Sequence, residues 1–404
     1  MNTEEKLTRN VGKQLYIERF GQEAYDSRID HILPTEEDPR KWPFSRRIKE
    51  WFRFQYWLAR FIVLFSLGTL IFGRRMTHTV GIAGKGKFLV NPNPAFVGLP
   101  IFQAGKAFNI VVRQADASYF DNAACVVRSC SVKFFDDAGR NVLDILMNSG
   151  ATAILWNIPS FLRLTGIRKI GETSENLKNF FKEDPLATEL VKDNMYRIDT
   201  LTDLSYYSKI RYLVKDEAGR TIACQFRCIP NKPAPEGRIS VEVIDKNGQW
   251  RRGRFAGDDR PWNYLHQEYE KRIAQAPVEY TLQVQQKEVL DRHHSFSRDM
   301  YYCNAKWEAP WLDVGTIRVQ ELIDGAAARK LSFNIAHRPG WLKLPKSYSI
   351  DDYCSIAAFR TRVYPRIQPL RHFSYFVKKV FGKAYHYNHK TATPPTSDGT
   401  SRTK

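Results

Sequence analysis

The chain has 404 residues, enough for one large domain or two ordinary ones, and its 43% hydrophobic residues can fill a sizeable core. Six cysteines are too few for a disulfide framework, which excludes the small disulfide-rich class. The formal net charge of +19 leaves three readings open: an anionic membrane surface, a nucleic acid, or a basic face that is simply solvated.

The first 60 residues predict charged helical structure that ends in the apolar run Phe61–Phe72. The N-terminus lacks the basic and then apolar succession of a secretory signal, so we expect a cytoplasmic protein. The run has thirteen uncharged residues between Arg60 and Arg74, whereas a membrane span needs about 20. We therefore expect it to pack on the protein, with peripheral contact to a membrane as the alternative because tryptophans and arginines precede it.

Alternation of apolar and polar residues from Met76 onwards predicts a series of strands. They cover residues 76–90, 108–117, 128–137, 141–150, 205–230, 278–289 and 314–322. The fifth of these segments is a hairpin that turns at Asp216 to Gly219, and its residues Cys224, Phe226 and Cys228 are expected on a buried face as reduced core residues.

Helical patterns occur at 175–194, 262–275 and 350–381, the last despite Pro365 and Pro369. About eight strands with helices at the ends predict an α+β fold, a closed antiparallel eight-stranded β-barrel with surrounding helices. We expect one domain over residues 1–382, followed by a disordered basic tail at 383–404 that is rich in Thr, Ser, Pro and Lys.

Arg360 and Tyr364 are spaced so that a helix places both on one face. A cation beside a phenol favours the phenolate, and tyrosinate is a known ligand of haem iron. Arg298 and Tyr302 have the same spacing, so the pattern alone equally fits an ordinary surface contact. A matching site for the opposite side of a haem decides between these readings.

The segment "RRMTHTVGIAGKGKF" supplies such a site, with His78 three residues after Arg75 and a run of small residues, Gly81, Ala83, Gly84 and Gly86, that lets a flat ligand approach the strand. Together with "SFNIAHRP" and "DDYCSIAAFRTRVYPRIQPLR", it resembles the haem catalases, and most closely the catalase-related allene oxide synthases. The resemblance covers residues 15 to 382 in order. Thr77 follows that branch, since true catalases have valine there.

The resemblance implies a ferric haem b with Tyr364 as iron ligand and Arg360 as its partner. By the same resemblance, Arg75, Arg113 and Arg371 contact the haem propionates, and Arg128 also falls on a family arginine. The catalytic residues implied on the other face of the haem are His78, Asn148 and Thr77.

The implied activity is conversion of polyunsaturated fatty acid hydroperoxides to allene oxides by O–O homolysis. The alternatives are a small catalase or haem peroxidase acting on hydrogen peroxide, a hydroperoxide lyase or isomerase of the same fold, and a basic binding protein without chemistry. The branch is often fused to a lipoxygenase, which suggests an upstream lipoxygenase as partner, and no nucleic acid is expected. The positive charge then serves to steer an anionic fatty acid to the entrance.

Overall fold

The structure is a computed structural model, and it describes residues 41–73, 75, 77–117, 121–151, 157–159, 161–162, 193–231, 257–289, 307, 309–352 and 355–381. Its helices are α4 (Phe44–Phe72), α8 (Tyr264–Gln275), α10 (Gly325–Lys330) and α11 (Ser355–Val380). Its strands are β1 (Gly81–Val90), β2 (Ala107–Asp116), β3 (Val126–Phe135), β4 (Asn141–Ser149), β5 (Met195–Tyr196), β6 (Tyr206–Ser208), β7 (Tyr212–Lys215), β8 (Thr221–Pro230), β9 (Val278–Glu288) and β10 (Trp311–Leu322).

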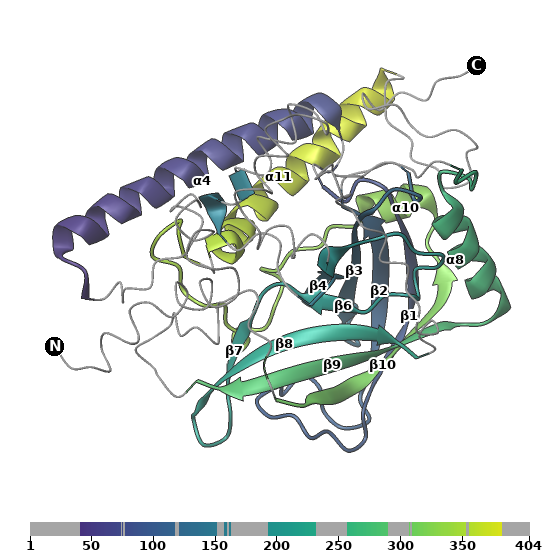
Figure 1. Cartoon of the computed structure of the whole chain (residues 1–404), viewed down its shortest axis with the longest axis horizontal. Helices are drawn as coiled ribbons and strands as arrows, with labels where there is room; N and C mark the ends of the chain where they lie inside the picture. Colours follow the sequence, from purple (N-terminus) through teal and green to yellow (C-terminus); the bar gives the residue numbers. More distant parts are fainter. Residues whose placement is uncertain are drawn as a thin grey trace.

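Within the described residues, eight strands close into an antiparallel barrel in the order β1-β2-β3-β4-β6-β8-β9-β10 and back to β1. β5 pairs with β3, and β7 pairs with β8 beyond the end of β6. Figure 1 shows the barrel with α11 and α4 along one side. The expected eight-stranded barrel with helices around it is confirmed.

Aromatic side chains fill the barrel between β1, β2 and β3. Phe88 packs edge to face on Phe134 with ring centroids 5.2 Å apart, and Phe102 and Phe108 join the same cluster. All four rings are buried. Because barrel strands turn alternate side chains inward, these rings form a packed core and leave the ends of the barrel for a site.

The hairpin and its cysteines agree with the sequence prediction. The Gly219 amide donates to the Asp216 carbonyl at 3.0 Å, and Gly219 has φ +76°, which glycine adopts without strain. Cys224 and Cys228 on β8 are buried free thiols. The helix expected at 262–275 is α8, whereas the helix expected at 175–194, except for its last two residues, and the tail at 383–404 lie outside the described residues.

The glycines of β1 serve two purposes, and only one was foreseen. A Cβ on Gly84 would meet Val319 at 2.5 Å, and one on Gly86 would meet the Arg318 carbonyl at 1.9 Å. These two glycines therefore permit the close approach of β10, beside a bulge at Lys85/Gly86. Gly81 and Ala83 do border the pocket described below.

α4 is one unbroken helix of 29 residues, so the sequence estimate of its apolar length was wrong. The helix continues N-terminally through Arg60. By length and composition it meets the requirement for crossing a membrane, and most of its apolar part is not buried in the protein.

α11 remains helical through Pro365 and Pro369 because its N-terminal half is fixed by packing. Phe359 contacts Phe54 and Phe61 of α4, with ring centroids 4.9 and 5.4 Å apart. Val363 belongs to the same cluster. This tertiary contact outweighs the cost of prolines in a helix and sets the position of the residues that follow.

Candidate functional site

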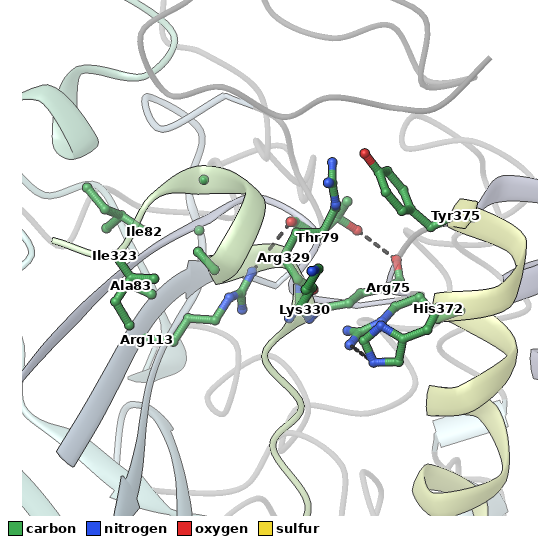
Figure 2. A pocket seen from close by; sticks show the side chains of 15 residues that line it. Arg75, Thr79, Ile82, Ala83, Arg113, Ile323, Arg329, Lys330, His372 and Tyr375 are labelled. Atoms are coloured by element: carbon green, nitrogen blue, oxygen red, sulfur yellow. Dashed lines mark hydrogen bonds between the residues drawn. The ribbon is translucent and has the colours of Figure 1, made fainter. Parts of the chain in front are cut away.

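One pocket lies where the start of β1, α10 and α11 meet (Figure 2), and it encloses about 770 Å³, part of it open to solvent. Arg113 enters from the strands, and His372 and Tyr375 enter from α11 (Figure 2). Among the described residues that line it there is no aspartate or glutamate, and the basic ones are Arg75, Arg113, Arg329, Lys330 and Arg371.

The arginines of this pocket are held by carbonyl oxygens. Arg75 and Arg371 both donate to the Leu331 carbonyl, at 2.5 and 3.0 Å. Burial and the positive charges of its neighbours lower the pKa of Arg75 well below its usual value, and burial and Arg329 lower that of Arg371 to about 10. A cluster of cations that lowers its own pKa values is stabilised by a bound anion, so the pocket suits carboxylates or phosphates.

His78 lies at the edge of this cluster in an unusual backbone conformation. It has φ +55°, and it is the one positive-φ residue other than glycine among the described residues. Its amide donates to the Ala117 carbonyl at 3.0 Å, and its own carbonyl accepts from Arg113 at 2.7 Å. Such strain persists only where surrounding contacts impose it, and it is frequent at functional sites.

The His78 ring is neutral and incompletely bonded. Burial, followed by the charges of Arg113, Arg360 and Arg75, lowers the pKa of His78 from 6.5 to about 3. Its Nδ1 atom is buried and has no hydrogen-bond partner in the part of the chain that the structure describes. A neutral imidazole with an unused nitrogen can accept a proton from a ligand.

Asn148 lies at the same end of the barrel as His78. The strand register forms one row from Gly81 on β1 through Ala115 and Ser129 to Asn148 on β4. Asn148 is half-buried, and its side-chain amide makes no hydrogen bond to any described residue. The register therefore puts Asn148 in one row with Gly81, three residues after His78.

The expected pair on α11 forms. Arg360 Nε donates to the Tyr364 hydroxyl at 2.9 Å, and both residues are half-buried. Arg360 is close enough for its charge to lower the pKa of His78. In the described structure, Arg360 and His78 thus lie at the same end of the barrel as the three arginines that were predicted to contact the propionates. Tyr302, the other tyrosine with an arginine four residues before it, lies outside the described residues.

Thr77 is placed differently from what its proposed role requires. Its side chain is exposed, and it does not donate to the His78 ring, whose Nδ1 stays unpaired within the described residues. A hydrogen bond from Thr77 to the imidazole, one of two roles that the sequence suggested, is absent here. The other role, contact with a bound peroxide, stays a prediction.

Several pocket residues were missed from the sequence. Arg329, Lys330, His372 and Tyr375 line the pocket, and Arg329 stacks 3.4 Å above the Tyr375 ring. The signal was the "ARK" end of the short helix α10, but only the fold brings it beside α11. Arg128, in contrast, is fully buried against Asp116 and donates to the carbonyls of Asn122 and Ala124, so it holds a loop rather than a ligand.

Two of the relatives found by comparison with known sequences carry the word lipoxygenase in their names. The chain is 30% identical over 377 residues to the allene oxide synthase-lipoxygenase protein of Plexaura homomalla, covering 90% of this chain and 34% of that protein. It is 26% identical over 304 residues to a linolenate 9R-lipoxygenase of Nostoc, covering 72% and 38%. It thus spans about a third of the length of these two relatives. No family model matches the sequence.

Comparison with solved structures identifies the fold. A fungal catalase superposes with a TM-score of 0.57 at 15% identity, covering 74% of this chain and 59% of that one. A bacterial catalase gives 0.54 at 13% identity, covering 74% and 57%. The chain therefore has the fold of the catalases, and its sequence is similar to part of the allene oxide synthase-lipoxygenase protein.

Proposed function

We propose that this chain binds a ferric haem at the end of the barrel, with Tyr364 as iron ligand. Three features fit such a group. The Tyr364 oxygen accepts a hydrogen bond from the cationic side chain of Arg360, which orients it. The described residues that line the pocket include four arginines and a lysine, and such a basic pocket suits propionates. His78 Nδ1 is buried without a partner within the described residues.

We further propose that the bound haem acts on polyunsaturated fatty acid hydroperoxides and yields allene oxides. A tyrosinate-ligated ferric haem supplies an iron able to take part in cleavage of a peroxide O–O bond. The net change is loss of water from the hydroperoxide, so no external reductant is needed. The sequence relative named as an allene oxide synthase supports this choice over the catalases, which share only the fold at 13–15% identity.

The residues of this chain then have distinct tasks. His78, neutral because of burial and neighbouring arginines, takes the hydroperoxide proton on a ring nitrogen. Asn148 donates an amide hydrogen bond that orients the peroxide group. Arg75, Arg113 and Arg371 bind the carboxylates of the cofactor and fix its rotation in the pocket.

The upstream partner in this proposal is a lipoxygenase that makes the hydroperoxide. Both sequence relatives carry that word in their names, and this chain matches about a third of each. The net charge of +19 favours approach of an anionic lipid. We place the reaction in the cytoplasm, where the proposed partner supplies the substrate.

The single observation that carries the proposal is the Arg360–Tyr364 hydrogen bond on α11, where the charge of Arg360 also acts on His78. Purified protein should contain haem, consume fatty acid hydroperoxides from a positional panel and form allene oxides or their hydrolysis products, identified by mass spectrometry. Rapid oxygen release from hydrogen peroxide with no lipid turnover supports the catalase alternative instead. Aldehyde fragments among the products support the lyase alternative.

A second tyrosine provides the matched test of the ligand. Tyr364→Phe should lose the ferric haem spectrum, because phenylalanine offers no oxygen to the iron. Tyr196→Phe is the control: Tyr196 on β5 is also half-buried, and it does not line the pocket. Equal haem content in the Tyr364→Phe variant and the wild type would refute the assignment.

A further inference from the structure

The helix α4 has one face that is fixed to the protein. Phe54, Leu58 and Phe61 are buried against Phe359 and Val363 of α11. Polar contacts add to this attachment: Arg53 pairs with Asp351 at 2.5 Å, and Ser349 donates to Glu50 at 2.6 Å. The helix is held lengthwise along the protein, and Figure 1 shows it as the outermost element on this side.

The opposite face of α4 is apolar and exposed. Phe52, Tyr56, Val63, Leu67 and Leu70 are 37–62% exposed. At 3.6 residues per turn these five positions fall within an arc of about 60°, centred opposite Phe54, Leu58 and Phe61, and they extend over about 27 Å. We call this row the α4 stripe. Contiguous exposed apolar rows of this size mark binding surfaces.

The charged residues of α4 are mostly positive. The helix has five basic residues, Arg46, Arg47, Lys49, Arg53 and Arg60, and its one acidic residue, Glu50, is turned toward Ser349. Arg46 and Arg60 lie over the rings of Trp42 and Trp57, at 4.4 and 4.9 Å from the ring centroids. Guanidinium groups are thus held along aromatic rings beside the apolar row.

The two tryptophans, the tyrosine and four of the five basic residues of α4 lie in its N-terminal half, and its C-terminal half is richer in aliphatic residues. Trp and Tyr rings prefer the headgroup level of a bilayer, basic side chains pair with lipid phosphates, and aliphatic side chains enter the acyl region. Binding of a nucleic acid would leave the aliphatic row of Val63, Leu67 and Leu70 without an apolar partner. An anionic bilayer surface matches both the charge and the apolar content.

We propose that α4 is an interfacial membrane helix that lies flat on an anionic lipid bilayer, with the α4 stripe inserted and the flanking arginines and Lys49 on the phosphates. It lies flat rather than crossing, because a crossing helix would have to leave α11 and break the Arg53–Asp351 pair. The residue that caps the C-terminal end of the helix, Gly73, borders the pocket. The bilayer is thereby brought near the pocket entrance, which under the proposed function suits a lipid substrate.

Full-length protein is tested by flotation with vesicles of phosphatidylcholine containing 30% phosphatidylglycerol, and with pure phosphatidylcholine, at low and high salt. Binding should be strong on the anionic vesicles at low salt and fall with salt or without the anionic lipid. The variant Phe52→Ser/Val63→Ser/Leu67→Ser should bind about a hundredfold more weakly, because three apolar side chains no longer leave water.

The matched control uses three exposed residues of α11, Phe373, Phe376 and Val380, which are 62–66% exposed. They lie on the side of α11 opposite Ser374 and Lys378, the residues that contact the end of α4. Changing all three to serine removes comparable apolar surface from another face and should leave vesicle binding within about twofold of wild type.

Three outcomes would overturn the proposal: no binding of the wild type, equal loss in the stripe and α11 variants, or resistance of bound protein to carbonate extraction, which indicates a crossing helix. Self-association that the stripe variant abolishes, in a protein that does not bind vesicles, would assign the α4 stripe to a second copy instead. Vesicle binding is measured without substrate, so its failure leaves the proposed haem chemistry untouched, and loss of haem chemistry leaves this result untouched.

Discussion

Arg75 and Arg371, 296 positions apart, both donate to the carbonyl oxygen of Leu331. One residue precedes the first barrel strand and the other lies on the last described helix. A single neutral acceptor between two guanidinium groups leaves their mutual repulsion uncompensated, and burial increases it. This arrangement is unfavourable unless an anion completes it, which is the physical reason for assigning it to cofactor carboxylates.

Arg371→Leu should therefore weaken haem retention by about tenfold to a hundredfold, the range expected for loss of one charge-assisted hydrogen bond. The rate of haem transfer to an excess of a haem-scavenging globin measures it. Arg366→Leu on the same helix is the control, since Arg366 is exposed and does not line the pocket. A similar loss in both variants would mean that the effect is structural.

Stability should depend on the protonation of His78. Its folded pKa of about 3 lies below the unfolded value of 6.5, so the unfolded chain binds more protons between these pH values. The contribution of His78 to stability is fully present above pH 6.5 and is lost as the pH falls toward 3. Between pH 7.5 and 5 the wild type should lose at most about 2 kcal/mol from this source.

The comparison is denaturant unfolding of wild type and His78→Gln at pH 7.5 and 5. Glutamine does not titrate, so the variant should show a smaller fall in the free energy of unfolding. Parallel falls in the two proteins would contradict the low pKa of His78.

Arg128 should matter for folding and not for ligand binding. Its side chain is fully buried and paired with Asp116, so Arg128→Met leaves a buried carboxylate and should cost about 3–5 kcal/mol of unfolding free energy. Arg128→Met/Asp116→Asn should recover part of that loss. If the single variant were as stable as wild type but failed to bind haem, the structural role would be wrong.

Thr77→Val tests what separates the lipid enzymes from catalases. Thr77 is exposed and does not bond the imidazole, so any effect must act through the bound peroxide. We expect oxygen release from hydrogen peroxide to rise several-fold, because valine removes a hydroxyl that competes for the peroxide. Thr79→Val is the control for changing a neighbouring hydroxyl, which bonds the Arg75 carbonyl at 2.8 Å. Unchanged oxygen release from Thr77→Val would remove Thr77 from the site.

His78→Ala should slow hydrogen peroxide decomposition by about a hundredfold to ten-thousandfold, the usual value of general acid-base assistance. Lipid hydroperoxide turnover should fall by a smaller factor, because homolytic cleavage of the O–O bond depends less on proton transfer to a base. Stopped-flow consumption of both substrates measures the two factors. Equal factors for the two substrates would contradict a homolytic route.

The barrel could be predicted from the sequence alone, and so could one hydrogen bond of the candidate site. Alternation with period two set the strands, Asp216 and Gly219 set a turn through local backbone preference, and the spacing of Arg360 and Tyr364 set a hydrogen bond within one helix. These features depend on neighbours along the chain, which a sequence displays directly.

Other features of the fold and of the candidate site depend on contacts between residues far apart in the sequence. The sequence could not show that β10 approaches Gly84 and Gly86 too closely for a side chain. It also could not show that Arg128 forms an ion pair with Asp116, or that Arg329 and Tyr375 line the pocket. It also left open which side of α4 would be covered, and packing on α11 settled that while leaving the α4 stripe exposed. Each of these outcomes depends on contacts between residues far apart in the chain, and such contacts exist only after the barrel has closed and α11 has packed beside it.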